Sequence, residues 1–210
     1  MSYKSHWEKI YATKRQDEVS WYQSTPRVSL DFITELNIPK DASIIDIGGG
    51  DSYLVDNLLT AGFTDITVLD ISGAAINKAK QRLGKKAEKI NWIVSDINDL
   101  VVDKKFDCWH DRAAFHFLTT EDQVQKYLTI AQDHISKNGR MIISTFSTAG
   151  PEKCSGLPIK QYSEQTLSGV LKNWFEKIKC ITTDHITPFN TIQNFLFCSF
   201  KKINFNNGNS

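Results

Sequence analysis

The sequence predicts an α/β fold: a doubly wound, seven-stranded sheet that is mostly parallel and ends in a C-terminal antiparallel hairpin. Three observations predict it. Short apolar runs alternate with helical patterns between residues 44 and 146. The runs are apolar at consecutive positions, as in parallel strands that are buried on both faces. The last two runs follow one another without a helical pattern between them.

Five apolar runs are predicted as the parallel strands. Each is rich in Ile, Val, Leu or Phe, and glycines or polar turn residues bound most of them. The runs span residues 44–48, 66–70, 90–95, 106–110 and 141–146. Parallel neighbours need a crossover connection, and helical patterns occupy most of the intervals between the runs.

Capping residues mark where the connecting helices begin and end. Ser72 fits the N-cap of the helix that follows the second strand. Thr120 and Gln123 fit a capping box for the helix before the fifth strand, and Gly139 is predicted to end that helix. Ser163 is predicted to start the last helix.

The chain after the last helix is predicted to form the hairpin. Its apolar runs lie at residues 179–186 and 194–201, and their connection is too short for a crossover helix. We therefore interpret residues 1–203 as a single domain that includes an N-terminal helical segment, residues 1–40. Residues 204–210 are polar and are predicted to be a flexible tail.

Composition excludes several classes of partner. Lys and Arg number 25 against 24 Asp and Glu, a net charge of +1, so the chain has no general attraction for nucleic acid or anionic membranes. No apolar run reaches the length of a membrane span, and the first residues lack the apolar core of a signal peptide. Neither nucleic acid nor membrane is expected as a partner, and a monomer is favoured.

The four cysteines favour a reducing setting. They are scattered along the chain and include no C-x-x-C pair: Cys108, Cys154, Cys180 and Cys198. This spacing predicts neither a zinc site nor a disulfide framework, so we expect no metal and a cytoplasmic location.

A glycine turn follows the first strand. Gly48, Gly49 and Gly50 stand between that strand and the next helix, where glycines let a ligand approach the backbone. Taken alone, such a turn is ambiguous, because glycines also occur simply to make a tight bend.

Acidic residues at the ends of three strands narrow the choice of ligand. Asp70 ends the second strand, where an acid binds ribose hydroxyls in nucleotide-binding folds. The dinucleotide pattern requires a third glycine at position 53, where this chain has Tyr53. Asp46 would repel a pyrophosphate but suits a cationic ligand, and Asp96 can accept a hydrogen bond from an adenine amino group.

These motifs resemble those of class I S-adenosylmethionine-dependent methyltransferases, which have a Rossmann-like fold. The residues Ile45 to Gly50 resemble the first motif of that family, Val68 to Ser72 the second, and Ser95 to Ile97 the third. The segment 106–118 is similar to the fourth-strand motif of small stand-alone members. The resemblance implies S-adenosylmethionine as cofactor and S-adenosylhomocysteine as product.

The resemblance also implies roles for individual residues. Gly48, Gly49 and Gly50 would lie near the methionine part with Asp46, while Asp70 with Ile71 would contact the ribose region. Asp96 and Ile97 would hold the adenine, and Asp111 and Arg112 would line the crevice beside the methionine end.

The N-terminal segment resembles the W-E-x-x-Y opening of several small methyltransferases. In those proteins the segment forms a lid over the cofactor, which implies cofactor contacts for Trp7, Tyr11 and Trp21. Trp7 and Tyr11 are four residues apart and would share one helix face.

The methyl acceptor is less well determined, because methyl transfer mainly requires positioning and exclusion of water. His116 is a candidate general base, with a structural histidine as the alternative. The irregular stretch 150–158 is a candidate acceptor wall, and Cys154 and Tyr162 are candidate contacts.

Two kinds of acceptor stay open, a small molecule and a protein lysine. The N-terminal opening and residues 62–66 resemble lysine methyltransferases of elongation factor 1A. Residues 110–113, His-Asp-Arg-Ala, replace that subgroup's acid-lysine-glycine-threonine motif, so a small molecule is favoured. The alternative functions are a catalytically silent cofactor-binding subunit and, less favoured, a nicotinamide-dependent oxidoreductase.

Overall fold

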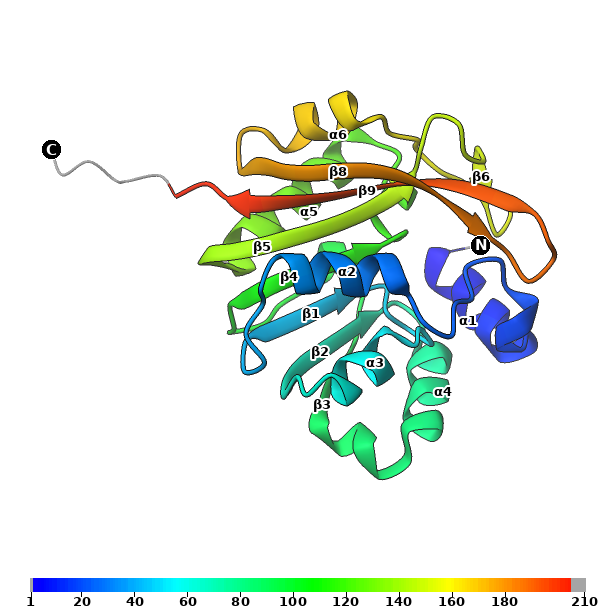
Figure 1. Ribbon diagram of the computed structural model, residues 1–210. Helices are drawn as coiled ribbons and strands as arrows, with labels where there is room; N and C mark the ends of the chain where they lie inside the picture. The colour runs from blue at the N-terminus through cyan, green and yellow to red at the C-terminus, as the bar shows by residue number, and fades with distance from the viewer. Residues whose placement is uncertain (1, 205–210) are drawn as a thin grey trace, which may run out of the picture.

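A computed structural model describes residues 2–204, so most of the predicted tail, residues 205–210, lies outside the described residues. The large sheet has the strand order β3-β2-β1-β4-β5-β9-β8 (Figure 1). Its strands are β1 (Ser43–Ile47), β2 (Asp65–Asp70), β3 (Ile90–Val94), β4 (Phe106–Arg112), β5 (Ile135–Phe146), β8 (Phe175–Ile186) and β9 (Ile192–Lys202).

The pairing of these strands confirms the predicted fold class. β1 to β5 are parallel to one another, whereas β9 is antiparallel to both β5 and β8. The strand order reverses beside β1, whose neighbours are β2 and β4. In open sheets of this kind ligands bind outside the carboxyl ends of the strands at such a point.

Helices cover both faces of the sheet (Figure 1). One face packs against α2 (Arg27–Glu35), α3 (Leu54–Thr60) and α4 (Gly73–Leu83). The other packs against α5 (Glu121–His134) and α6 (Glu164–Leu171). Short 3-10 helices complete the connections: η1 (Gln16–Glu18), η2 (Gly84–Lys89), η3 (Ile97–Asp99) and η4 (Phe115–Phe117).

The predicted caps lie where the sequence indicated. The hydroxyls of Ser72, Thr120 and Ser163 each accept a hydrogen bond from a backbone N–H in the first turn of α4, α5 and α6. Thr120 and Gln123 form the expected reciprocal box. These bonds satisfy N–H groups that have no partner within the helix.

The first helix, α1 (Tyr3–Thr13), differs from the others because none of its residues is fully buried. It lies beside the carboxyl ends of the strands and packs against α4 (Figure 1). By contrast, α2 buries Phe32 and Ile33 in the core. The predicted N-terminal segment therefore contains a peripheral helix and a core helix.

The fifth strand begins earlier than predicted. α5 ends at His134 and β5 starts at Ile135, so Gly139 lies within the strand rather than at the helix end. Between the pairs Phe106–Ile135 and Cys108–Arg140 the register shifts. Gly139 fits this irregularity because a Cβ atom there would be 2.5 Å from the Ile135 side chain.

Residues 150–158 are more regular than expected. They contain a small antiparallel ladder of β6 (Lys153–Cys154) and β7 (Leu157–Pro158). Ser155 and Gly156 connect the strands with φ angles of 51° and 80°, values found in tight hairpin turns.

The structure also corrects one expectation about the cysteines. Cys180 of β8 and Cys198 of β9 are register partners with Cα atoms 4.1 Å apart, and they form a disulfide. Their distance of 18 residues along the chain concealed this pair, because the hairpin is what brings them together. Cys108 and Cys154 are free and buried.

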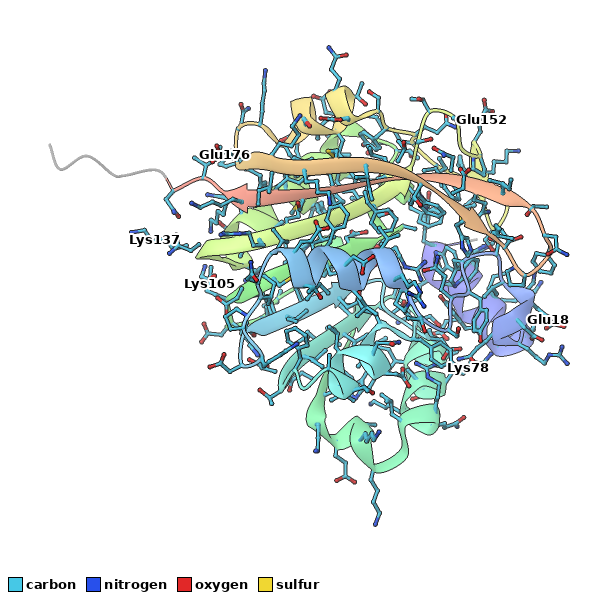
Figure 2. All side chains as sticks on the ribbon, viewed as in Figure 1. Glu18, Lys78, Lys105, Lys137, Glu152 and Glu176 are labelled. Atoms are coloured by element: carbon cyan, nitrogen blue, oxygen red, sulfur yellow. A yellow bond between two sulfur atoms is a disulfide. The ribbon has the colours of Figure 1, made fainter. Side chains whose placement is uncertain are left out.

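Charged side chains extend away from the sheet at many points of the outer surface, for example Lys137, Glu152 and Glu176 (Figure 2). Within residues 2–204, none of the helices combines the length and the hydropathy of a membrane-spanning segment.

Candidate functional site

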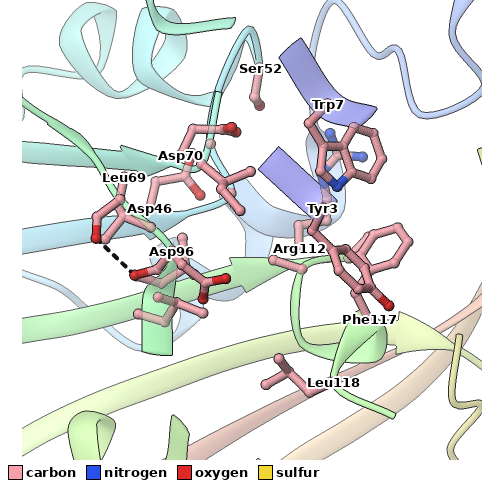
Figure 3. Close-up of a pocket in the computed structure, with 18 of the residues that line it drawn as sticks. Tyr3, Trp7, Asp46, Ser52, Leu69, Asp70, Asp96, Arg112, Phe117 and Leu118 are labelled. Atoms are coloured by element: carbon pink, nitrogen blue, oxygen red, sulfur yellow. Dashed lines mark hydrogen bonds between the residues drawn. The ribbon is translucent and has the colours of Figure 1, made fainter. Parts of the chain in front are cut away.

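One cavity lies at the carboxyl ends of β1 to β4, at the point where the strand order reverses (Figure 3). Its two walls differ in chemistry. One wall carries the glycine turn and the predicted acids Asp46, Asp70 and Asp96. The other carries aromatic side chains of α1 and of the segment after β4. The structure thus brings the three acids together from three different strand ends.

The glycine turn is shaped for close contact. Gly48 has a φ of +65°, and a Cβ atom there would be 2.8 Å from the Ala114 Cβ. The Gly49 N–H donates to the Leu69 carbonyl at 3.1 Å, which ties the turn to β2. Gly48 and Gly49 line the cavity, so this turn leaves the backbone open to a ligand.

Gly50 has a different role from the predicted one, because it is absent from the cavity lining. A Cβ atom at Gly50 would lie 2.4 Å from the Asp70 Oδ2 atom. The glycine therefore makes room for the Asp70 carboxylate behind the turn. Gly50 therefore acts on the cavity through Asp70, which lines it.

Asp70 is a buried carboxyl group, only 4% exposed. Its Oδ1 atom accepts a hydrogen bond from the Ser72 N–H at 2.8 Å. Burial raises the pKa of Asp70 to about 7, and the nearby charges of Asp46 and Glu8 act in the same direction. The carboxylate therefore gains from any ligand that donates hydrogen bonds to it.

Asp46 is held by a polar partner that the sequence did not place in the site. Asp46 on β1 is paired in register with His110 on β4. The His110 Nδ1 atom lies 2.7 Å from the Asp46 Oδ1 atom. The His110 Nε2 atom lies 2.9 Å from the Ser29 hydroxyl on α2. All three residues are at most 3% exposed, and His110 also lines the cavity.

Asp96 and the residues beside it form the adjoining part of the wall. Asp96 caps η3 by accepting a hydrogen bond from the Asn98 N–H at 2.9 Å. Ile71, Asp96 and Ile97, which the sequence analysis assigned to the ribose and the adenine, all line the cavity.

The aromatic wall is built from two parts of the chain, the N-terminal segment and the segment after β4. Tyr3, Trp7 and Tyr11 repeat every four residues along α1 and line the cavity with Trp21 and Phe117. The Trp7 ring lies 5.6 Å from Trp21 and 5.2 Å from Phe117, both edge-to-face. The same four-residue spacing could have identified Tyr3, which the sequence analysis missed.

Glu8 attaches α1 to the rest of the domain. Its carboxylate accepts hydrogen bonds from the Gly73 N–H at 2.7 Å and the Ala74 N–H at 3.0 Å, and from the Ser72 hydroxyl at 3.2 Å. Burial alone would raise the pKa of Glu8, but these hydrogen bonds lower it overall. A helix N-terminus favours a negative charge at this position.

Arg112 lines the cavity as the sequence predicted, at the end of β4. Its guanidinium donates long hydrogen bonds of 3.3 and 3.4 Å to the Trp21 carbonyl and one of 3.4 Å to the Gln23 side chain. Burial lowers the pKa of Arg112. The nearby charge of Asp46 acts in the opposite direction. A partly buried cation whose hydrogen-bond acceptors are neutral and distant is suited to an anionic ligand.

Asp111 does not line the cavity, contrary to the sequence prediction. It is fully buried and accepts hydrogen bonds from Ala114 N–H, Phe115 N–H and the Tyr127 hydroxyl on α5. Burial raises its pKa to about 6. The prediction missed this because β4 continues to Arg112, so successive side chains alternate between the two faces.

His116, the candidate base, also lies outside the cavity lining. It is fully buried, its Nδ1 atom accepts a hydrogen bond from the Phe146 N–H at 3.4 Å, and burial lowers its pKa to about 3. The turn of η4 directs Phe117 to the cavity and His116 to the core. This is the structural histidine that the sequence analysis held as the alternative.

Cys154 and Tyr162, the two candidates for contact with the acceptor, differ in their position relative to the cavity. Cys154 on β6 lines the cavity, and burial raises the pKa of its thiol to about 12. Tyr162 is buried beside Phe115 and does not line the cavity. Several further lining residues were not predicted to contact the cofactor: Ser52, Ser95, Asn98, Ala113, Ala114, Leu118 and Gln123.

A family profile described as a methyltransferase domain matches residues 38–195, about three quarters of the chain. The chain belongs to the methyltransferase domain family. This confirms the resemblance drawn from the glycine turn and the acids. The matched residues of this methyltransferase domain contain the whole carboxylate wall of the cavity and all the lining residues of the segment after β4.

Relatives of this methyltransferase domain differ in their acceptors. A protein named ubiquinone biosynthesis O-methyltransferase, from Rickettsia conorii, is 26% identical over 157 residues, covering 75% of this chain and 53% of the relative. A protein named eEF1A lysine and N-terminal methyltransferase, from Mus musculus, is 24% identical over 119 residues, covering 56% of this chain. The chain spans 53% and 17% of the lengths of these two relatives.

Solved structures of methyltransferases share the fold. A 1,6-didemethyltoxoflavin-N1-methyltransferase from Burkholderia thailandensis, crystallised with 1,6-didemethyltoxoflavin and S-adenosylhomocysteine, matches with a TM-score of 0.77 at 18% identity. The match covers 96% of this chain and 87% of that one. At this identity the similarity supports the arrangement of the sheet and helices described above.

Proposed function

We propose that the protein is an S-adenosylmethionine-dependent methyltransferase. The observation that carries the proposal is the meeting of Asp46, Asp70 and Asp96 beside an open glycine turn in one cavity. The ribose hydroxyls, the adenine amino group and the ammonium group of a cationic nucleoside ligand all donate hydrogen bonds, which carboxylates accept. A carboxylate at Asp46 is unfavourable for the pyrophosphate of a dinucleotide.

The lining residues fit the cofactor along its length. Asp70 would accept hydrogen bonds from the ribose hydroxyls, and Asp96 one from the adenine amino group. Asp46 would bind the ammonium group beside Gly48, where a side chain would leave no room. Arg112 is the cation in the lining suited to the cofactor carboxylate.

The cofactor, when bound, supplies an electrophilic methyl group on a sulfonium. The aromatic wall then performs the protein's part of the reaction. Trp7, Trp21 and Phe117 exclude water, and their ring faces favour a nearby cation. This wall would position an acceptor beside the cofactor, and positioning is the main requirement for the transfer.

Two side chains of the lining outside the carboxylate wall, Cys154 and Tyr11, are unsuited to take a proton. Burial keeps Cys154 protonated with a pKa of about 12, and the pKa of Tyr11 is raised well above its ordinary value by burial and by Asp70. We therefore expect neither of these two groups to act as a general base. We favour a small molecule over a protein lysine, because α1 covers the aromatic part of the cavity.

Calorimetry with S-adenosylhomocysteine and with NAD tests the cofactor assignment. We expect binding of S-adenosylhomocysteine in the micromolar range and none of NAD. Binding of NAD without binding of S-adenosylhomocysteine would overturn the proposal.

Incubation with methyl-labelled cofactor tests the acceptor. A panel of small aromatic and aliphatic acids, phenols, thiols and amines is compared with elongation factor 1A as the protein substrate. We expect label in a small molecule. Label only in the protein would overturn the preference for small acceptors while leaving the methyltransferase assignment in place.

A further inference from the structure

A buried chain of polar side chains runs from the cavity wall to the helix behind it. Asp46 on β1, His110 on β4 and Ser29 on α2 are joined by contacts of 2.7 and 2.9 Å. Their exposed fractions are 3%, 1% and 1%. Polar groups buried this deeply are unfavourable unless each is hydrogen bonded, so the chain is built as a unit.

The partners of His110 determine its tautomer. A carboxylate only accepts hydrogen bonds, so the His110 Nδ1–H must donate to Asp46. A neutral ring then accepts at Nε2, and the Ser29 hydroxyl donates to it. Ser29 thus satisfies the second ring nitrogen without a second proton on the ring. In this arrangement the neutral His110 ring holds Asp46 without adding a positive charge beside its carboxylate.

The two oxygens of Asp46 have different surroundings. His110 fixes Oδ1, whereas Oδ2 lies against the glycine turn, where a Cβ atom on Gly49 would be only 2.5 Å away. Asp46 and Gly49 both line the cavity. The hydrogen bond at Oδ1 therefore directs the free oxygen toward the turn.

We propose that His110 is a positioning residue for the amino-acid end of the cofactor, with Ser29 as its support. It fixes the orientation of Asp46 and keeps the carboxylate charge available to the ammonium group. The inference rests on the proposed function, since it assigns the ammonium group to Asp46. It gives a role in ligand binding to two side chains that do not themselves need to contact the ligand.

The test compares two ligands that differ only at the amino-acid end. S-adenosylhomocysteine carries the ammonium group, whereas 5′-methylthioadenosine has the adenine, ribose and thioether without it. Binding of both is measured by calorimetry for the wild-type protein, His110→Leu, His110→Asn, Ser29→Ala and the control His134→Leu. His134 lies at the end of α5, bonded to the Lys104 carbonyl.

We expect His110→Leu to weaken S-adenosylhomocysteine binding about 10- to 100-fold, the range for a hydrogen bond to a charged group. Binding of 5′-methylthioadenosine should be unchanged. His110→Asn keeps an N–H near the Nδ1 position and should restore most of the affinity. Ser29→Ala should give a smaller loss, and His134→Leu none.

Equal losses for both ligands would mean that His110 only maintains the fold, and unchanged binding of S-adenosylhomocysteine would remove it from the site; either result overturns the inference. Melting temperatures of the unliganded variants show whether each is folded, and His110→Asn gives the comparison if His110→Leu is not. If the wild-type protein binds neither ligand, the proposed function itself fails.

Discussion

Asp70 shows how burial and binding oppose each other at a single residue. Its carboxyl group is almost completely removed from water, and this burial raises its pKa to about 7. The sequence located this acid at the end of a strand, but its protonation depends on Gly50, Asp46 and Glu8, which approach it only in the fold. A ligand that donates hydrogen bonds would stabilise the ionised form.

Replacing Asp70 with Ala should weaken the binding of S-adenosylhomocysteine by about 1–3 kcal/mol, because the ribose hydroxyls would lose their acceptor. Calorimetry at pH 8, where the carboxyl group is ionised, gives the affinity. Asp99→Ala is the matched control, since Asp99 is exposed near the same strand ends. Equal affinities for wild type and Asp70→Ala would exclude Asp70 from the site.

The raised pKa of Asp70 also predicts a pH dependence of stability. The group contributes fully below its unfolded pKa near 4, and the contribution is lost as pH rises through about 7. Without ligand, the wild-type protein should therefore lose stability relative to Asp70→Asn between about pH 5 and pH 8, on the order of 2 kcal/mol. Urea unfolding of both proteins across this range measures the difference. Parallel profiles would contradict the expected ionisation.

At the scale of elements, the cavity combines a rigid wall and a weakly attached one. The carboxylate wall stands on strands of the central sheet, whereas the aromatic wall includes α1, which has no fully buried residue. Glu8 connects the two by capping α4, the helix that begins just after Asp70. Elements with little buried surface open at low free energy, so α1 is the element expected to move during ligand exchange.

Replacing Glu8 with Ala should speed the dissociation of S-adenosylhomocysteine roughly 5- to 50-fold, because α1 loses its bonds to α4. The melting temperature should fall by only about 2–4 °C, the effect of losing one helix cap in a chain of this size. Stopped-flow displacement measures the rate, with Lys9→Ala on the exposed side of α1 as control. A dissociation rate equal to that of wild type would show that Glu8 does not retain the ligand.

At the scale of the whole molecule, the predictions that succeeded are those that depend on a local sequence pattern. The five parallel strands, the hairpin and the acids at strand ends were readable because each has a local pattern. The direction of Asp111, His110 and His116 was not readable, because it depends on where β4 ends and how η4 turns. The Cys180–Cys198 pair depends on the register of β8 against β9, which local patterns do not determine.

Ligand binding should be visible in the stability of the whole domain. S-adenosylhomocysteine at about 100 times its Kd should add roughly 2.7 kcal/mol to the unfolding free energy. For a chain of this size that corresponds to a rise of about 5–10 °C in melting temperature. Differential scanning calorimetry measures it, with NAD at equal concentration as the control. A rise with NAD alone would contradict the cofactor assignment.

The position of β9 has a consequence for how the protein is made. This strand is the last in the described chain, yet it lies between β5 and β8 in the sheet. During synthesis the first 146 residues can assemble their parallel strands while β5 stays a bare edge. An unpaired edge with buried residues such as Met141 and Ile143 is prone to associate with other chains. Protection from aggregation therefore has to last until Lys202 has left the ribosome.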